Sequence, residues 1–390
     1  MENAPFYKKG GFPQVYTQIF ILIFLARNDI LIIYYFFGEN FMDYTSIIKR
    51  KVEPTPKDVH IDGKAVFGTF DKEFENMNFL DINKPVPRLP DCFKKLKLTL
   101  WEAVEVNLKD GILLAAPCDM GVFGTILVLF YNKKEKKVYK WEANTSAKDV
   151  TISKTLLNGD ESVGNSKNLN VKVINNFGEG KATVIGKGKG HGGEIEYNFE
   201  LTRVSTPCVV SIPFGENRPL YSQKDFFKAV GSVTVNGVTY TSDEDTTAII
   251  DDHRGYYPRR AHYDWVTTMG VNDNDGERKY IAFNLTRNQS IDQDKYNENL
   301  IWFEGSQSLL PPVKFVHETD TRWRVTDEYG MVDVVFDIGD TYARILHAGL
   351  INIDYYVTFG DISGYVTDLD GKKYILDGMS GIGEDKSLLF

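Results

Sequence analysis

The segment Glu194-Ile-Glu-Tyr-Asn-Phe-Glu-Leu201 alternates between polar and apolar side chains. Successive side chains of a strand point to opposite faces of a sheet, so this pattern predicts a β-strand with one buried and one solvated face. Farther along, Asn236-Gly237 separates two short apolar runs, and this dipeptide is the strongest short-range signal for a β-hairpin. Asp370-Gly371 predicts a similar tight turn. We therefore expect antiparallel strands.

The same signals recur over most of the chain after residue 60. Further predicted strands are residues 126–131, 138–141, 169–174, 280–286, 300–304, 313–317, 323–326 and 332–336. Helical periodicity is scarce, and only residues 44–51 and 223–230 are expected to form short helices. Many short strands separated by turn residues are typical of all-β proteins, whose antiparallel strands form sandwiches or barrels.

The length of 390 residues exceeds one ordinary domain and allows two domains with a full core each. The β pattern is interrupted at Thr206-Pro207 and Ile212-Pro213. We therefore expect one β-barrel domain over residues 43–205 and a second over residues 206–390, which carries the main motifs. The sequence indicates no oligomeric state.

The composition narrows the partners and the compartment. A formal charge of -9, without a basic stripe, argues against nucleic acid as a partner. Cys92, Cys118 and Cys208 are widely spaced, which is typical of reduced thiols in an intracellular protein rather than of a disulfide framework. A cytoplasmic location is therefore expected.

Residues 1–42 differ in composition from the rest of the chain. Two apolar runs, residues 19–26 and 30–37, are separated by Arg27 and Asp29. A single spanning helix needs about 20 apolar residues and would bury both charges near its centre. The segment is interpreted as a membrane anchor with membrane contact through residues 16–37, as a signal peptide, or as an artefactual extension of a chain that starts at Met42. Membrane association is expected only if the extension is real.

The sequence offers no recognisable motif for a cofactor or a metal. The run from Gly186 to Gly193 is glycine-rich, but a strand rather than a helix follows it, so a hairpin is expected in place of a phosphate-binding loop. His253 and His262 lack partners at zinc-like spacing. Neither a Gly-x-Ser-x-Gly nucleophile nor a dinucleotide fingerprint occurs. We expect no cofactor and no metal.

The densest group of chemically active side chains is Asp251-Asp-His-Arg-Gly-Tyr-Tyr-Pro258, followed by Tyr263-Asp-Trp265. Carboxylates beside an imidazole can hold it protonated or fix its tautomer, and both states serve general acid–base catalysis in a closed pocket. Tyrosine hydroxyls can donate to a substrate oxygen. The candidate catalytic residues are Asp251, Asp252, His253, Tyr257 and Tyr263.

The same stretch allows a structural interpretation, in which Arg254 bridges the two aspartates in a buried polar corner. A second polar cluster follows, in which Asn284 would be a buried amide in need of partners if its strand faces a barrel interior. The candidate substrate-binding residues are Arg254, Asp264, Trp265, Asn284 and Glu298.

Several blocks of this sequence occur in the same order in one family. They are Ile212-Pro-Phe214, Asn217-Arg218, Tyr221-Ser222, residues 250–258, Tyr263-Asp-Trp-Val-Thr267, Phe283-Asn-Leu-Thr286, Asn288-Gln289, Tyr296-Asn-Glu-Asn299, Leu310-Pro-Pro312 and residues 381–384. From about residue 60 to its end the chain resembles the domain-of-unknown-function 2804 family. That family is distantly similar to two-domain lipocalin-like proteins, a group with carotenoid hydratases and cyclases. The resemblance implies two lipocalin-like antiparallel barrels and an apolar substrate handled without a redox cofactor.

Three functions stay open. The first hypothesis is a cofactor-free acid–base enzyme (a hydratase, isomerase or cyclase) on an apolar small molecule, with His253 or Asp252 as the proton donor and Asp251 orienting the imidazole. The second is a non-catalytic carrier of a lipid or isoprenoid, and the third is a structural protein. An enzyme predicts that these residues converge on an open pocket, and a carrier predicts an apolar cavity that they at most rim. A structural role predicts that Arg254 fills the corner and that no cavity of ligand size, about 300 Å³ or more, remains.

Within the first hypothesis, the remaining residues have supporting roles. Tyr257 and Tyr263 would polarise a substrate oxygen, while Asn284 and Glu298 would fix the substrate or a water molecule.

Overall fold

The computed structural model describes residues 21–22, 34–35, 44–274, 276–348 and 351–389. The predicted extension over residues 1–42 and its membrane contact through residues 16–37 lie outside the described residues, except for the paired β1 (Ile21–Leu22) and β2 (Tyr34–Tyr35). Within the described part of the chain, no helix combines the length and the hydrophobicity needed to cross a membrane.

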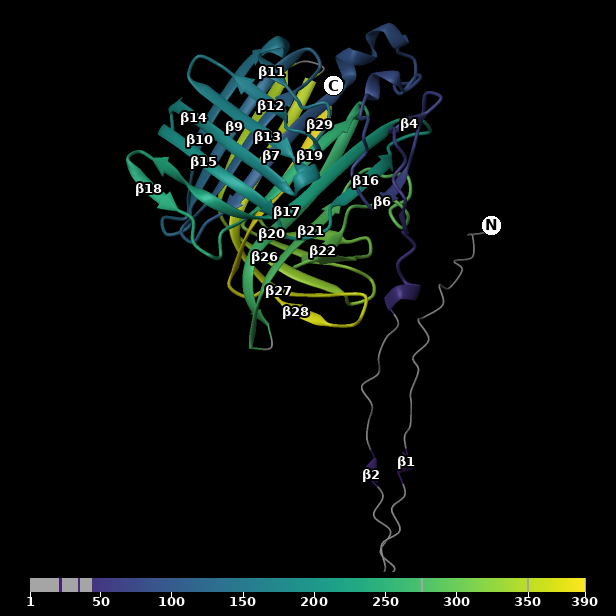
Figure 1. Cartoon of the computed structure of the whole chain (residues 1–390), viewed down its shortest axis with the longest axis vertical. Helices are drawn as coiled ribbons and strands as arrows, with labels where there is room; N and C mark the ends of the chain where they lie inside the picture. Colours follow the sequence, from purple (N-terminus) through teal and green to yellow (C-terminus); the bar gives the residue numbers. More distant parts are fainter. Residues whose placement is uncertain (1–20, 23–33, 36–43, 275, 349–350, 390) are drawn as a thin grey trace, which may run out of the picture.

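Two sheets, antiparallel apart from one short two-residue pairing, form the body of the molecule (Figure 1). The first is a nearly closed barrel with the strand order β10-β9-β8-β7-β19-β17-β15-β14-β13-β12-β11. Its strands are β7 (Thr99–Asn107), β8 (Gly111–Asp119), β9 (Phe123–Asn132), β10 (Lys137–Ser146), β11 (Val150–Thr151), β12 (Asp160–Asn165), β13 (Leu169–Asn176), β14 (Lys181–Gly190), β15 (Gly193–Arg203), β17 (Pro219–Val235) and β19 (Thr247–Gly255). Four shorter strands extend it: β3 (Val52–Glu53), β6 (Gly68–Phe70), β16 (Cys208–Pro213) and β18 (Val238–Thr241).

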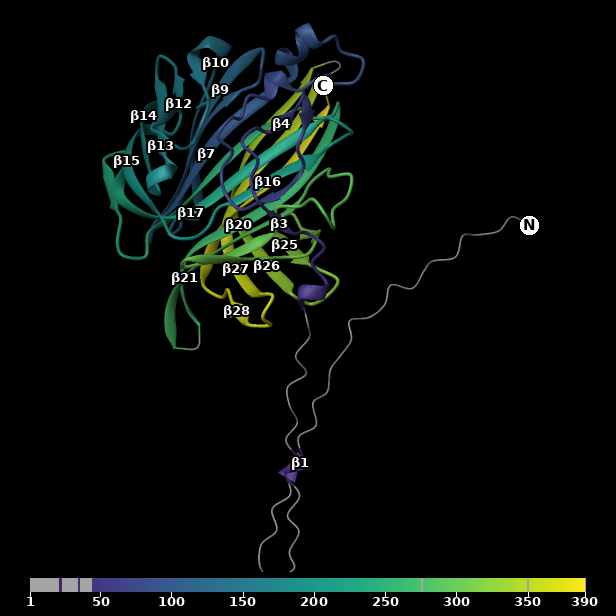
Figure 2. The same ribbon diagram turned by 45° about the vertical axis from the view of Figure 1, so that its right-hand side comes forward.

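The second sheet is a half-barrel with the order β23-β22-β21-β20-β29-β27-β26-β25-β24, and β28 pairs with β27. Its strands are β20 (Arg260–Asn274), β21 (Glu277–Arg287), β22 (Leu300–Phe303), β23 (Ser306–Leu309), β24 (Lys314–Thr319), β25 (Arg322–Thr326), β26 (Val332–Ala348), β27 (Ile351–Thr367), β28 (Lys373–Ile375) and β29 (Met379–Leu389). Figure 2 shows β26–β28 packed beneath the long strands β17 and β20.

The remaining elements are small. β4 (His60–Ile61) pairs with β5 (Lys64–Ala65). The helices are single 3₁₀ segments: η1 (Tyr44–Ser46), η2 (Phe79–Asp81), η3 (Asp91–Lys97), η4 (Ala147–Asp149) and η5 (Phe177–Glu179).

The predicted all-β fold is confirmed, as are its decisive signals. β15 alternates between buried and exposed side chains along its length. Asn236 and Gly237 have φ values of 51° and 83° and join β17 to β18, which is the backbone of a type I′ hairpin turn. The glycine-rich run up to Gly193 forms the hairpin between β14 and β15, as expected, rather than a phosphate-binding loop.

The predicted helix over residues 223–230 is wrong, because these residues lie in the middle of β17. The first nine residues of β17 are all buried, since one face packs inside the first barrel and the other packs against the second sheet. A strand buried on both faces shows no alternation of polar and apolar residues. Residues 44–51 form only the short η1.

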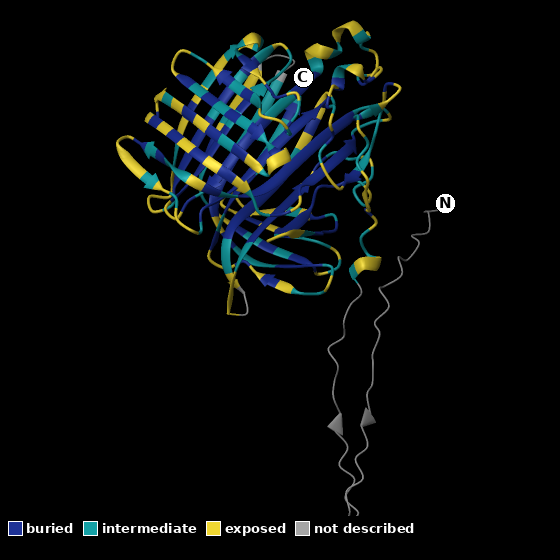
Figure 3. Cartoon of the chain, viewed as in Figure 1, coloured by how far each residue is buried: buried dark blue, intermediate teal, exposed yellow. Residues whose placement is uncertain are grey.

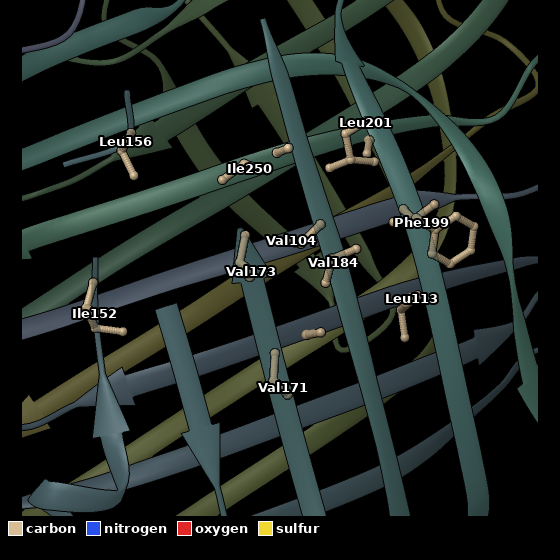
Figure 4. Close-up of a cluster of buried hydrophobic side chains, with 14 of the residues drawn as sticks. Val104, Leu113, Ile152, Leu156, Val171, Val173, Val184, Phe199, Leu201 and Ile250 are labelled. Atoms are coloured by element: carbon tan, nitrogen blue, oxygen red, sulfur yellow. The ribbon is translucent and has the colours of Figure 1, made fainter. Parts of the chain in front are cut away.

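Three hydrophobic clusters follow from this layering. The first fills the barrel and contains Val104, Val184 and Phe199 (Figure 4). The second, with Phe226 and Trp302, lies between the sheets, and the third lines the inner face of the second sheet. Figure 3 shows the outer strands striped by exposure, whereas the strands between the two layers are buried along most of their length.

The first sheet continues to Gly255, and the second begins at Arg260. The expected boundary at residue 205 falls between β15 and β16, two strands of the same sheet. Whether residues 43–205 and 206–390 are separate domains stays a prediction.

Candidate functional site

A cavity lies between the two sheets, walled by strands of both. The space open to the centres of water-sized molecules is about 130 Å³, so several water molecules fit. The wall is mostly apolar and aromatic, with Trp101, Phe214, Tyr257, Tyr263, Trp265 and Tyr355 among its rings. By this measure the cavity is smaller than the roughly 300 Å³ of typical ligand pockets, so only a small organic ligand would fit it.

Strand β19 decides which residues of the central motif reach this cavity. Its side chains alternate between the two faces of the first sheet. Asp251 and His253 line the cavity, whereas Asp252 and Arg254 are buried on the opposite face, inside the first barrel. The motif therefore contributes to two separate sites.

The polar wall of the cavity is centred on the buried ammonium group of Lys224, on β17. Its Nζ lies 2.6 Å from Glu298 Oε2 and 3.1 Å from Asp251 Oδ1. It is also 2.8 Å from His253 Nε2 and donates to Ser222 Oγ at 2.9 Å. The sheet register produces this arrangement, because Lys224 pairs with Asp251, and Ser222 with His253, across β17 and β19.

Burial and ion pairing set the charges of this cluster. Burial lowers the pKa of Lys224, but Asp251 and Glu298 outweigh it, so the pKa is raised. Burial raises the pKa of both carboxyls, yet the neighbouring His253 and Lys224 bring each below its ordinary value. One lysine and two carboxylates leave one net negative charge.

His253 is fixed by stacking as well as by polar contacts. Its ring stacks on Trp101 with a centroid distance of 4.6 Å and an interplanar angle of 13°. Nε2 is 3.0 Å from Ser222 Oγ and 2.9 Å from Asp251 Oδ1. Nδ1 is buried and has no hydrogen-bond partner among the described residues. In a Ser–His–Asp triad the aspartate holds Nδ1 and the serine contacts Nε2. Here both approach Nε2, so the geometry is not that of a serine hydrolase.

Tyrosines line the cavity beside this cluster. Tyr257 stacks on Trp101 at 5.8 Å, and burial raises the pKa of its phenol well above the ordinary value. Tyr263 donates to Glu384 Oε2 at 2.7 Å, and Tyr355 donates to Glu384 Oε1 at 2.6 Å. Both oxygens of Glu384 are thus occupied, whereas the phenol of Tyr257 stays protonated and available to a ligand.

Glu105, on β7, adds a carboxyl to the cavity wall. The side chain is buried, and burial, followed by the charge of Asp251, raises its pKa well above the ordinary value. Its Oε2 has no hydrogen-bond partner among the described residues. Burial thus favours the protonated form of Glu105, which is able to donate a proton.

The other face of β19 forms a buried polar corner, but among the described residues Arg254 pairs there with Asp252 alone and does not bridge to Asp251, as the structural interpretation expected. Arg254 donates to both oxygens of Asp252, from Nε at 2.6 Å and from Nη2 at 2.8 Å, and to the carbonyl oxygen of Ser153 at 2.7 Å. Glu102 lies opposite Asp252 on β7. Arg254 and Asp252 face the barrel interior and do not line the cavity, which differs from the roles expected of them.

The other predicted residues divide between the cavity and its surroundings. Trp265 and Glu298 line it. Asn284 is buried behind the wall, where it accepts from Trp265 Nε1 at 2.6 Å and donates to the carbonyl oxygen of Glu298 at 2.8 Å. Asp264 lies outside the set of lining residues, with Oδ2 at 3.3 Å from His262 and Oδ1 at 3.1 Å from His317.

Among the described residues, His262, Asp264 and Asp385 form one group whose ligand atoms lie within 4.8 Å of one another, so they could hold a cation. Sequence spacing did not indicate this group, because Asp385 lies on another strand. Burial raises the pKa of Asp264, but hydrogen bonds from His262 and His317 lower it overall to about 2. Ion pairing with the two histidines accounts for the positions of these groups.

Sequence reasoning missed several residues of the cavity. They are Lys224, Glu105, Trp101, Glu384 and Lys386, together with Ser222, which contacts Lys224. Lys224 lay in the stretch 223–230 interpreted as a helix, and Ser222 directly precedes it. The available signal was a lysine within an otherwise buried β run, which is costly unless the lysine is paired.

Comparison with known proteins places the chain in a family. The model described as "Domain of unknown function (DUF2804)" matches residues 50–390, which confirms the family resemblance. Curated protein sequences give no match. Among solved structures, kievitone hydratase from Nectria haematococca is similar at 11% identity and a TM-score of 0.46, covering 75% of this chain and 88% of that one. A candidate AttH from Nitrosomonas europaea is similar at 11% identity and a TM-score of 0.44, covering 77% and 98%.

Proposed function

The chain belongs to the domain-of-unknown-function 2804 family, which names no reaction, and we propose from its own cavity that it is a cofactor-free acid–base enzyme. Its substrate would be a small, largely apolar molecule, and its reaction a hydration, an isomerisation or a cyclisation. The observation that carries this proposal is the group of Lys224, Asp251, His253 and Glu298 in the wall of an otherwise apolar cavity.

The position of these charged residues favours a catalytic role over a purely structural one. Each buried ion costs several kcal/mol of desolvation, and an apolar replacement is often neutral or stabilising. The Asp252–Arg254 pair is sealed inside the barrel, so it needs no ligand to account for it. The Lys224 cluster instead borders space for a ligand, where a proton can be exchanged with a bound molecule.

We assign the proton transfer to His253, because its ring lines the cavity and its Nδ1 has no hydrogen-bond partner among the described residues. Ser222 and Asp251 hold the ring through Nε2. The Tyr257 hydroxyl would donate to an oxygen of the substrate. Asp252 is not retained as a proton donor, because it lies on the opposite face of β19. Tyr263 would instead hold Glu384.

In this proposal His253 gives a proton to one carbon of a polarised double bond. Either water or a hydroxyl group of the substrate bonds to the other carbon and loses its own proton to the carboxylate of Asp251. In an isomerisation, a neighbouring carbon loses a proton to the same carboxylate instead. The atoms balance in each case without an oxidant or a reductant.

The test is turnover of a panel of α,β-unsaturated ketones and terpenoid alkenes in D₂O and in H₂¹⁸O, followed by mass spectrometry. The wild-type chain should incorporate deuterium or oxygen-18 into at least one compound. His253→Gln should reduce that rate by roughly 100-fold or more, and His191→Gln, which changes an exposed turn, should not. Binding without isotope incorporation in either protein would contradict the proposal.

The apolar wall favours a second candidate, a carrier of a lipid or isoprenoid. A carrier would copurify with the same unmodified ligand in the wild type and in His253→Gln. Native mass spectrometry with solvent extraction of the bound molecule distinguishes the two functions.

A further inference from the structure

A second lysine, Lys386, reaches the cavity from β29 on the opposite sheet, where Arg344 also lines the wall. The Nζ of Lys386 lies 4.6 Å from the ring centre of Tyr355, 5.2 Å from that of Trp101 and 5.8 Å from that of Tyr263. Among the described residues, no carboxylate lies within ion-pair distance of this ammonium and no hydrogen-bond acceptor contacts it. Lys224, by contrast, has contacts with two carboxylates.

The neighbouring carboxylate does not supply the missing partner. Glu384 precedes Lys386 by two residues on the same face of β29, but hydroxyls of Tyr263 and Tyr355 occupy both of its oxygens. Burial lowers the pKa of Lys386 more than the nearby Glu384 raises it. An anionic ligand atom would reverse that balance, because an opposite charge favours the ammonium form.

We infer that Lys386 anchors an acidic oxygen, a carboxylate or a phenolate, of the cavity's ligand. The ring faces of Trp101, Tyr263 and Tyr355 favour a cation beside them, while the remaining direction faces the cavity. The ligand is thereby defined as a small, largely apolar molecule with one acidic group.

The anchor also fixes how such a ligand lies. Trp101 stacks on His253 and contacts the Lys386 ammonium, so the two polar groups flank one indole. A ligand held by its acidic oxygen at Lys386 would therefore extend its apolar part toward His253. This orientation rests on the proposed function, whereas the anchoring of an acidic oxygen does not.

The experiment is isothermal titration calorimetry on the full chain with two matched ligand pairs. Octanoate is compared with 1-octanol, and 4-propylphenol with 4-propylanisole. The wild type should bind the acidic member of at least one pair about tenfold or more tightly than its neutral partner. The ligand pair that shows the preference indicates whether Lys386 binds a carboxylate or a phenol. Equal affinities within both pairs would overturn the inference without any variant.

Lys386→Met should abolish the preference and leave the neutral ligand bound, while Lys386→Arg should keep it. Lys373→Met is the matched control, because Lys373 lies 3.7 Å from the ring centre of Tyr365 on the exposed strand β28. Retention of the preference in Lys386→Met would overturn the inference. If the protein prefers acidic ligands but turns over no substrate, the proposed reaction is wrong and the anchoring role of Lys386 still holds. If Lys386→Met leaves turnover unchanged, the anchoring role is wrong and the proposed reaction still holds.

Discussion

At the scale of the residue, Lys224 holds together a cluster that would be unfavourable without it. Replacing it by methionine leaves Asp251 and Glu298 buried without their cation. We expect Lys224→Met to lower the free energy of unfolding by about 3–5 kcal/mol, measured by urea denaturation. The triple variant Lys224→Met, Asp251→Asn, Glu298→Gln should recover most of that loss, since it removes the charges as well.

The matched control is Lys228→Met on the same strand, whose exposed ion pair with Glu304 spans 3.5 Å. An exposed pair contributes at most about 1 kcal/mol. If Lys224→Met lowered the free energy of unfolding by no more than this control, Lys224 would not be balancing the charges of the two carboxylates.

A second residue, Glu102, makes stability depend on pH. Burial, followed by the charge of Asp252, raises its pKa from 4.5 to about 8. Because the folded-state pKa lies above the unfolded-state value, its contribution is complete below about pH 4.5 and is lost as the pH rises through about 8. Glu102→Gln should flatten this decline and raise the free energy of unfolding at pH 8 by roughly 1–3 kcal/mol.

Urea denaturation at several pH values between 5 and 8 measures this effect. Glu196→Gln, on the exposed face of β15, serves as the control and should keep the wild-type slope. Parallel profiles for Glu102→Gln and the wild type would show that the carboxyl is ionised in the folded state.

At the scale of the element, the strands with one solvent-exposed face were the ones that the sequence predicted correctly. β15 and the Asn236-Gly237 turn were predictable because one side of each is exposed to water. In such a strand polar and apolar residues alternate with a period of two. β17 was mistaken for a helix because both of its faces are buried, so that polar and apolar residues lose their alternation. For the same reason the prediction of the candidate site left out Lys224 and Ser222, which lie on that strand.

The side chains of β19 point alternately to the two faces of the sheet, and the sequence-based prediction of the site did not take this into account. Asp251, Asp252, His253 and Arg254 were grouped by their proximity in the chain. Consecutive residues of a strand face opposite sides of the sheet, which places only Asp251 and His253 in the cavity. The partners Glu298, Glu105 and Lys386 come from distant strands, and pairing over such distances cannot be deduced from one sequence.

At the scale of the whole molecule, the cavity belongs to neither sheet alone. His253, Lys224 and Glu105 come from the first sheet, while Tyr355 and Lys386 come from the second. Binding and folding should therefore be coupled, because a ligand that contacts both walls stabilises only the packed state.

The sheet order also predicts how the chain can be divided. β17 and β19 lie between β15 and β7 in the first sheet, so a fragment of residues 43–205 lacks the strands that join its two parts. We expect this fragment to unfold without a cooperative transition, as followed by circular dichroism during urea denaturation. A fragment of residues 44–258 contains the whole sheet and should unfold cooperatively, while exposing the face that carries Phe226 and binding a hydrophobic dye. Cooperative unfolding of residues 43–205 would instead place the domain boundary near residue 205, and would make the two strands an addition to a barrel that folds without them.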